Sequence, residues 1–231
     1  MKAIFPYLSN VRSALLVMLI IAISSCENVQ PVQEATGLPD PDKVAQDEAM
    51  QREQRLGEEH ALFREAYADS VNMGLIEKDS FTGSARRESR LATPKGEIVI
   101  NYGSPGKRGR VLWNGLVSYD QVWVSGSHWA TALTFPADVS IDGQRIPAGT
   151  YAFFTIPGRE KWTLIVNENF DQHLAEDYEE ELDLIRLEVD PIQLSETVQR
   201  LTYGLDRAST DSVMLSLSWD QLRVNLPIKL L

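Results

Sequence analysis

Apolar residues recur at every second position through the C-terminal part of this chain, from about Ser89 onward. Period two is the spacing of side chains on one face of a β-strand, whereas a helix repeats every 3.6 residues. Three segments show the pattern most clearly: Ile98 to Tyr102, Trp162 to Val166, and Val213 to Trp219. We therefore expect half-buried strands, which need a second layer to cover their apolar faces.

Turn sequences separate the expected strands at intervals of about ten residues. Glycine, proline, aspartate and serine supply them, because these residues favour the backbone angles or local hydrogen bonds of tight turns. The clearest are residues 142–143 (DG), 147–149 (PAG), 157–159 (PGR) and 209–211 (STD). Roughly eight to ten short strands with this spacing predict a mainly β domain, either an antiparallel β-sandwich or a partly closed barrel.

Three details refine this expectation. Residues 151–156 (YAFFTI) are apolar at both odd and even positions, which places this strand at the centre of a sheet with both faces covered. Proline lacks a backbone N–H, so Pro227 predicts an edge or end strand. Leu174, Tyr178 and Leu182 recur at a spacing of four within an acidic run, and we expect a short helix there between strands.

An amphipathic helix is expected ahead of the β domain. Between Val44 and Asn72, apolar residues recur at spacings of seven and four, while glutamates and arginines cover the opposite side. The apolar residues are Leu56, Phe63, Tyr67 and Val71. This pattern predicts a helical spacer at residues 44–80 before a β domain at 84–231. Its apolar stripe packs on the domain or on a second copy of the chain; recognition of a partner is the alternative.

The N-terminal residues have the pattern of an export signal. Lys2 and Arg12 accompany an apolar run from Ala14 to Ile23, which is shorter than the roughly 20 residues that span a bilayer. The run leads into Ile-Ser-Ser-Cys, which resembles the lipobox of bacterial lipoproteins. The resemblance implies a signal peptide at residues 1–25, cleavage before Cys26, and acylation of that cysteine. An ordinary secretory signal with an incidental cysteine is the alternative.

Residues 26–43 predict a solvated, lipidated tether, because prolines and acidic residues replace apolar periodicity there. Cys26 is the one cysteine of the chain, so its lipidation leaves no thiol for a disulfide or a thiolate metal site. Glu27 follows it, instead of the aspartate that resembles an inner-membrane retention signal. We therefore expect a cell-envelope protein that its lipid anchors in the outer membrane, facing the periplasm or the surface.

Charge is unevenly distributed along the chain. There are 33 acidic and 22 basic side chains, for a formal net charge of −11. This balance argues against a nucleic-acid partner, because phosphate binding depends on lysine and arginine. Residues 86–110 nevertheless hold seven bases and two acids, and residues 168–190 hold ten acids and one base. Such blocks can face water separately, meet in the fold, or mark a site for an anionic ligand.

Glycines and tryptophans recur at characteristic spacings between residues 108 and 168. They stand with their neighbours at Gly109-Arg110, Trp113, Gly115-Leu116-Val117, Trp123, Gly126, Ala130-Thr131, Asp138-Val139, Gly143, residues 147–151 (PAGTY), Pro157-Gly158 and Trp162. This stretch resembles a bacterial family of exported proteins known as domain of unknown function 2911, and a weaker likeness runs from about Ser89 to Ile228. The resemblance implies a shared fold and names no reaction.

Three positions depart from the pattern of that family. The family usually carries Tyr-Ser-Arg-Pro where this chain has residues 102–105 (YGSP), so Ser104 stands where an arginine is usual. Within residues 123–131, Val124 replaces an arginine of the family and Trp129 replaces a glutamate. If those charged positions form the site of the family, this chain has exchanged a polar site for an aromatic one.

Two segments are candidates for a binding site. The glycines of residues 103–110 (GSPGKRGR) let a backbone approach a ligand closely, and the basic side chains there can clamp a carboxylate, sulfate or phosphate. Residues 123–129 add aromatic rings that can stack on a sugar. The alternatives are a basic loop that faces water and tryptophans that belong to the core. The candidate ligand-binding residues are Tyr102, Arg108, Arg110, Trp113, Trp123, Ser127, His128 and Trp129.

Binding is favoured over catalysis. Ser127 and His128 are a candidate nucleophile and base, but adjacent residues of a strand point to opposite faces unless Gly126 introduces a bulge. The chain also lacks a GxSxG elbow. The leading hypothesis is a membrane-anchored, non-catalytic module that binds an envelope glycan, peptide or protein and uses no cofactor or metal. The alternative is a hydrolase or lyase with His128 as its base and a pocket between residues 103–110 and 123–129.

Overall fold

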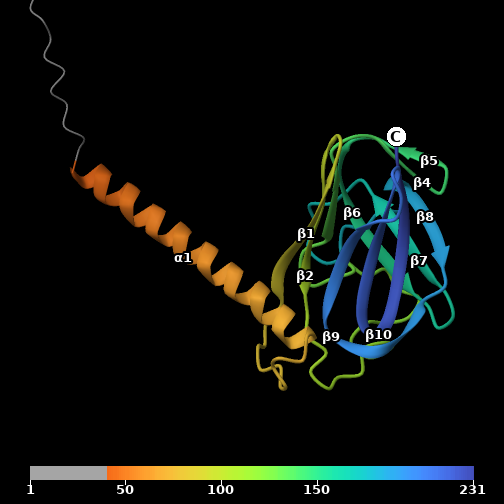
Figure 1. The fold of residues 1–231 in the computed structure, drawn as a ribbon, viewed down its shortest axis with the longest axis horizontal. Coiled ribbons are helices and arrows are strands. Elements are labelled where there is room, and N and C mark those ends of the chain that lie inside the picture. The colour runs from red at the N-terminus through yellow and green to blue at the C-terminus, as the bar shows by residue number, and fades with distance from the viewer. Residues whose placement is uncertain (1–40) are drawn as a thin grey trace, which may run out of the picture. The chain divides into compact units, whose positions relative to one another are not determined.

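Residues 41–231 are the part of the chain that the computed structural model describes (Figure 1). The predicted signal peptide at 1–25, the predicted lipidation site Cys26 and nearly all of the predicted tether at 26–43 lie outside the described residues. The described residues from Gln46 to Leu231 belong to one compact unit. This unit contains all of the described β-structure.

The described residues form ten strands in two antiparallel sheets. The larger sheet has the order β1-β2-β3-β6-β7-β8, and the smaller has the order β5-β4-β10-β9. The strands are β1 Ala85–Thr93, β2 Gly96–Ser104, β3 Thr131–Phe135, β4 Val139–Ile141, β5 Gln144–Ile146, β6 Gly149–Pro157, β7 Trp162–Asn167, β8 Asp183–Val189, β9 Ile192–Arg207 and β10 Ser212–Leu230. The sheets do not close into a barrel, so the prediction of a mainly β, antiparallel sandwich is confirmed.

Period two in the sequence marks the buried face of the strands. Ile98, Ile100 and Tyr102 of β2 are fully buried and pack in one core with the alternating residues of β7 and β10. These residues are Trp162, Leu164, Val166, Val213, Leu215, Leu217 and Trp219. The core therefore draws on both sheets, and burial of its apolar surface is the main force that holds them together.

Strand β6 is buried on both faces, as its apolar sequence predicted. Tyr151 and Phe153 belong to the main core between the sheets, whereas Ala152 and Phe154 belong to a second cluster on the opposite face. The remaining buried members of this second cluster are Val124, Ala130 and Ile165. Since β6 pairs with β3 on one side and β7 on the other, its predicted central position is confirmed.

All four predicted turns join strands. Residues 142–143 connect β4 to β5, and the positive φ angles of Asp142 (49°) and Gly143 (81°) are those of a tight hairpin turn. Residues 147–149 lead from β5 into β6, and residues 157–159 lead out of β6 towards β7. Residues 209–211 connect β9 to β10. Turn chemistry therefore located the strand ends well.

Strand β10 folds back on itself. Its register with β9 shifts on both sides of Asp220, which has a φ of 54°. Leu230 donates a backbone hydrogen bond to the Asp211 carbonyl at 2.7 Å. The two ends of this long strand therefore lie side by side, at the end of the sandwich that carries the β9–β10 turn.

Pro227 was predicted to lie in an edge or end strand; it lies in the last strand of the chain, but the edge position is wrong. The strand that contains it, β10, lies inside the smaller sheet between β4 and β9. Pro227 falls between Arg223, which is paired with β9, and Lys229, which is paired with β4. Its missing N–H group therefore interrupts neither of the two ladders.

The short helix predicted around Leu174, Tyr178 and Leu182 is also wrong. Leu174 has a φ of 55°, outside the right-handed helical region, and its N–H donates to the His128 carbonyl at 2.6 Å. A turn follows, and the helical residues are limited to the 3₁₀ segment Glu180–Leu182. A contact with a distant loop thus overrides the local helical spacing.

The helix predicted at residues 44–72 is present as α1, Pro41–Asn72. Ala68 and Val71 in its last turns are buried, whereas Phe63 is 69% exposed. The predicted apolar stripe is therefore buried at its C-terminal end and open to solvent at Phe63. Among the described residues, no helix is both long enough and apolar enough to cross a membrane.

Polar contacts fix the C-terminal end of α1 to the β domain. Asn72 donates from Nδ2 to the Arg200 carbonyl at 3.0 Å and accepts the Arg200 N–H at 2.7 Å. Asp69 forms an ion pair with Arg87 of β1. Tyr67 donates its hydroxyl proton to Asp79 Oδ1 at 3.2 Å. The helix is thus attached both to a strand of each sheet and to the segment that precedes β1.

Candidate functional site

Four of the five tryptophans interlock within the main core. Trp113 contacts the rings of Trp123, Trp162 and Trp219 edge-on, with centroid distances of 6.2, 4.8 and 5.9 Å. Trp123 and Trp219 stack with their planes 19° apart and their centroids 6.0 Å apart. We call these four rings the tryptophan layer. Aromatic pairs in such geometries stabilise the fold beyond the burial of their apolar area, so the layer should be rigid.

A cavity of about 320 Å³ lies against the tryptophan layer. This volume is at the lower end of the range of about 300–1,000 Å³ that small-molecule sites occupy. Its apolar wall includes Leu116, Val117, Trp123, Val124, Leu174 and Trp219. Its polar side chains are Thr82, Ser84, Arg108, Arg110, Ser127 and His128. We call this space the basic cavity, after Arg108 and Arg110.

The basic cavity brings together five of the residues that the sequence singled out: Arg108, Arg110, Trp123, Ser127 and His128. They come from two loops, one after β2 and one before β3, and antiparallel pairing of β2 with β3 places these loops at the same end of the sheet. The sequence could name the two segments, and the strand pairing explains why they meet.

Close approach of backbone segments shapes the cavity. A Cβ atom on Gly103 would lie 2.4 Å from the Ser127 carbonyl oxygen, and one on Gly106 would lie 2.3 Å from Asp79 Oδ2. Both distances are far below van der Waals contact. The first clash is with backbone, so only glycine fits at position 103, whereas a side chain at position 106 would displace the Asp79 carboxylate. The sequence predicted that these glycines approach a ligand; in the structure they let the loop after β2 pack against two other segments of the chain.

Buried hydrogen bonds hold the loop of residues 122–130 in place. The Ser125 carbonyl accepts from the Tyr203 hydroxyl at 2.7 Å and from the Thr131 hydroxyl at 3.2 Å. The Ser125 hydroxyl donates to Thr155 Oγ1 at 3.0 Å. Burial raises the pKa of Tyr203 well above its ordinary value, so this tyrosine stays a neutral donor at physiological pH.

The basic side chains of the loop after β2 have three different environments. Lys107 forms an ion pair with Asp220, which removes it from the role in anion binding that the sequence suggested. Arg110 donates to the carbonyl groups of Gly106 and Lys107 within its own loop. Arg108 is exposed and has no hydrogen-bond or ion-pair partner among the described residues. It is the cation most free to meet a ligand.

The lining of the cavity carries a single sign of charge. Arg108 and Arg110 are the charged residues that line it, and among the described residues that line it there is no aspartate or glutamate. This is unusual for a chain with a formal net charge of −11. A concave site lined by one sign of charge concentrates the field on its opening and attracts ions of the opposite sign. The cavity is therefore suited to an anionic group.

The basic block at 86–110 and the acidic block at 168–190 do not meet through ion pairs in the described part of the chain. The bases of the first block pair with Asp69, Glu88, Glu97 and Asp220. Within the second block, Arg186 takes the acidic partners. None of the ion pairs among the described residues joins the two blocks, so the alternative in which they meet through ion pairs is not observed.

Three hydroxyl groups, of Thr82, Ser84 and Ser127, and the imidazole of His128 line the same cavity. Ser84 donates to Ser127 Oγ at 2.9 Å, and His128 is the exposed neighbour of Ser127. No hydrogen bond joins Ser127 to His128 within residues 41–231, and the ring neighbour of His128 there is His173, with centroids 6.3 Å apart. The elements of a nucleophile and base are near each other, but the hydrogen bond that would activate the serine is not formed.

Residues 123–129 do not form the strand that the sequence predicted. Residues 125–128 are bends between isolated bridges at Trp123 and Trp129, with positive φ at Ser125 (54°) and His128 (67°). Ser127 and His128 consequently both line the cavity. Arg108 (47°) and Leu174 (55°) also have positive φ; strain of this kind costs about 1–3 kcal/mol per residue and gathers at functional sites.

A buried arginine supports the wall formed by residues 82–84. Arg200 of β9 donates from Nη1 to the carbonyl groups of Gly83 and Ser104, at 3.3 and 3.1 Å. Its Nη2 donates to the Phe81 carbonyl at 2.8 Å. The wall before β1 is therefore fixed by charge-assisted hydrogen bonds to the smaller sheet, and the cavity is largely preformed.

Three predicted ligand-binding residues lie elsewhere. Tyr102 is fully buried in the main core, with its ring 4.7 Å from that of Tyr203. Trp113 lies within the tryptophan layer and outside the cavity lining. Trp129 is 53% exposed and packs edge-on against His173 at 5.6 Å, also outside the lining.

Several lining residues were missed by the sequence reading. Trp219 was assigned only to a strand, and its proximity to Trp123 depends on how β10 meets the larger sheet. Leu174 reaches the cavity because residues 128 and 174 are joined by a backbone hydrogen bond. Thr82 and Ser84 precede the first strand. No local pattern in the sequence marks any of the four.

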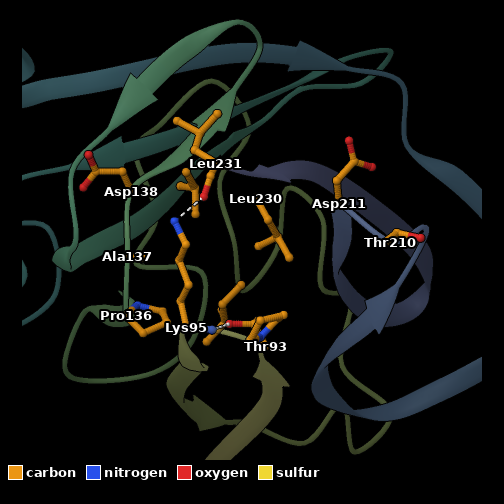
Figure 2. A pocket seen from close by; sticks show the side chains of 12 residues that line it. Thr93, Lys95, Pro136, Ala137, Asp138, Thr210, Asp211, Leu230 and Leu231 are labelled. Carbon is orange, nitrogen blue, oxygen red and sulfur yellow. Dashed lines mark hydrogen bonds between the residues drawn. The ribbon is translucent and has the colours of Figure 1, made fainter.

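A second cavity, of about 140 Å³, opens where the β1–β2 and β9–β10 turns meet the end of β10 (Figure 2). Figure 2 shows Lys95 reaching across it to Leu231, whose carbonyl oxygen accepts from Lys95 Nζ at 2.7 Å. Asp138 and Asp211 also line this cavity. Its charges are mixed, its lysine is occupied and its volume is small, so it is the weaker candidate for a site.

The described residues offer no cluster of three or more His, Cys, Asp or Glu side chains placed to hold a metal ion. His128 and His173 approach each other, whereas His60 lies far back along α1 in sequence.

Comparison with known proteins gives a family. The model of a family described as protein of unknown function (DUF2911) matches residues 84–228, which is more than half of the chain. The chain belongs to the DUF2911 family. Neither a curated protein nor a solved structure matches it. The matched range runs from the residue before β1 almost to the end of β10, so nearly the whole cavity lies within the DUF2911 domain.

The three departures from the family pattern have distinct environments. Ser104 is buried and donates to the Leu201 carbonyl at 2.7 Å. Val124 is buried in the second apolar cluster and also lines the basic cavity. Trp129 lies on the surface, outside the lining. Val124, at a position where the resemblance implies an arginine in the family, thus contributes to the apolar wall of the cavity.

Proposed function

We propose that this DUF2911 protein is a lipid-anchored protein of the cell envelope whose β domain binds a small anionic ligand in the basic cavity without transforming it. Envelope location and anchoring rest on the export signal and the lipobox-like residues that end at Cys26. Binding rests on the cavity. The two parts of the proposal are independent and have separate tests.

One observation carries the binding proposal: the cavity is lined by Arg108, Arg110 and His128 and by no carboxylate among the described residues. Arg108 has no protein partner in the described part of the chain. An unpaired guanidinium beside an apolar wall favours an anion strongly, because a charge-assisted hydrogen bond contributes about 1.5–3 kcal/mol.

The test is a titration of the purified chain with acetate, benzoate, phosphate and sulfate, followed by calorimetry and tryptophan emission. Trp123 and Trp219 line the cavity, so occupation should change their emission. Arg108→Ala should weaken binding of the best anion by about tenfold or more. Lys161→Ala removes the same charge from an exposed position outside the lining and should leave the affinity unchanged.

The binding proposal fails if none of the four anions binds, or if Arg108→Ala and Lys161→Ala weaken binding equally. Equal effects would indicate general attraction by net charge, because long-range attraction does not depend on the position of one side chain.

A hydrolase or lyase is the second candidate. The observation that favours it is the hydrogen bond between Ser84 and Ser127 beside His128, in a cavity of suitable size. Reproducible hydrolysis of a carboxylic ester that is abolished in His128→Ala, with an unchanged thermal midpoint, would establish this activity and overturn the non-catalytic proposal.

A further inference from the structure

The basic cavity is polarised from its mouth to its interior. Val117, Val124 and Trp219 are buried side chains with 4%, 3% and 0% exposure, and they form its inner wall. Arg108 and His128 are exposed residues of the same lining. The charge of Arg108 and the polar imidazole of His128 therefore lie at the opening, and apolar surface lies within.

Apolar side chains also continue to the opening. Leu116 and Leu174 line the cavity and remain 47% and 40% exposed. A ligand that covers these exposed leucines removes apolar surface from water, and the free energy of binding becomes more favourable in proportion to the area covered. An apolar ligand body would thus gain contacts both inside the cavity and at its rim.

The volume limits the size of such a body. About 320 Å³ corresponds to about ten water molecules at roughly 30 Å³ each. A body of roughly ten non-hydrogen atoms fills it. A hydrophilic ion such as phosphate would occupy only the charged mouth and leave the inner wall in contact with water.

From this arrangement we infer that the ligand is a compact amphiphilic anion: one anionic head group, held at the mouth by Arg108 and Arg110, on a small apolar body that packs against Val117, Val124 and the tryptophan layer. This inference rests on the proposed function, because it names the chemical class of ligand for the same cavity. It goes further by assigning the interior to the apolar part and the mouth to the charge.

The test uses a homologous series of straight-chain carboxylates: acetate, butanoate, hexanoate, octanoate and decanoate, titrated below their micellar concentrations. Each methylene buried should raise affinity by about fourfold, until the body exceeds the cavity and the rise stops. Octanamide, which has the octanoate body and no charge, should bind at least about tenfold more weakly than octanoate.

Matched variants separate the apolar part from the charge. Leu116→Ser should weaken octanoate binding by about fivefold and leave acetate binding unchanged. Val111→Ser alters an equally apolar residue of the same loop that is 75% exposed and outside the lining, and it should change neither. Circular dichroism checks that both variants fold.

The outcomes distinguish the two proposals. An affinity that stays constant along the series, with binding that still depends on Arg108, would overturn the amphiphile inference and leave the proposed function intact. Tight binding of phosphate or sulfate with no binding of octanoate would do the same. Failure of every anion to bind would overturn both.

Discussion

Arg200 and Asp79 form a buried ion pair in which Arg200 Nη2 lies 2.8 Å from Asp79 Oδ1, with side-chain exposures of 0% and 6%. The guanidinium also lies over the ring of Phe81, with its carbon 4.9 Å from the centroid. Because Asp79 precedes β1 and Arg200 belongs to β9, this pair links the wall of the basic cavity to the smaller sheet.

Asp79→Ala should lower the free energy of unfolding by about 3–5 kcal/mol, because it leaves the charge of Arg200 buried without a counterion. Chemical denaturation measures this loss. Glu97→Ala is the control, since it removes a carboxylate from the exposed pair with Arg90 and should change the midpoint little. Similar midpoints for the two variants would contradict the structural role assigned to the buried pair.

Gly103→Ala should distort the basic cavity. The added Cβ would lie 2.4 Å from the Ser127 carbonyl oxygen, so the loop of residues 122–130 must move, at a cost of about 1–3 kcal/mol. Binding of the anions and the near-ultraviolet signal of Trp123 should both change. Gly143→Ala strains a turn (φ +81°) with nothing within 4 Å of the new atom; it should lower stability while leaving binding as it was. Loss of binding in both variants would refute a local effect.

Stability should fall in alkaline solution. Burial raises the pKa of Tyr203 above its ordinary value of 10.0, so above about pH 10 the unfolded state loses this proton while the folded state keeps it. The contribution of Tyr203 is fully present below pH 10 and is lost as pH rises, by about 1.4 kcal/mol for each pH unit.

The variant Tyr203→Phe tests this assignment. Denaturation at several pH values should give a shallower alkaline slope than the parent chain, together with a loss of about 1 kcal/mol at neutral pH from the missing hydrogen bond to Ser125. An unchanged alkaline slope would mean that other groups control the transition.

Membrane attachment should depend on Cys26. Cys26→Ser removes the thiol that acylation needs, and the protein should then leave the membrane fraction when cells are lysed and centrifuged. Ser25→Ala keeps a small residue before the cysteine and should remain with the membrane. A Cys26→Ser protein that stays in the membrane fraction would show that attachment does not use this lipid.

The sequence predicted the fold well wherever side-chain period and turn chemistry act locally. Ile98, Ile100 and Tyr102 alternate in sequence and are buried together. The helix expected around Leu174 does not form, because the Leu174 N–H donates to the His128 carbonyl. No local spacing in the sequence shows this partner. Pro227 is in the last strand, as one alternative predicted, but not at an edge; an inner strand tolerates this proline because the ladder on each side of β10 ends before reaching it.

The candidate site was only partly predictable, for a similar reason. Arg108 and His128 could be chosen by their chemistry, and pairing of β2 with β3 then brings their loops together. Tyr102 was chosen as a ligand-binding residue, but it lies on the buried face of β2 with Ile98 and Ile100 and cannot reach a ligand at the surface. Trp219 becomes part of the lining only through its stacking on Trp123, which depends on how the two sheets pack.

The loop of residues 122–130 forms one side of the basic cavity and also covers the outer face of β6, where Val124 and Ala130 pack with Phe154. Amide protons of β6 should therefore be among the slowest to exchange with solvent. If this loop detached, the apolar outer face of β6 would be exposed to water, and we would expect the protein to self-associate through it. Selection for solubility thus constrains the loop independently of any ligand.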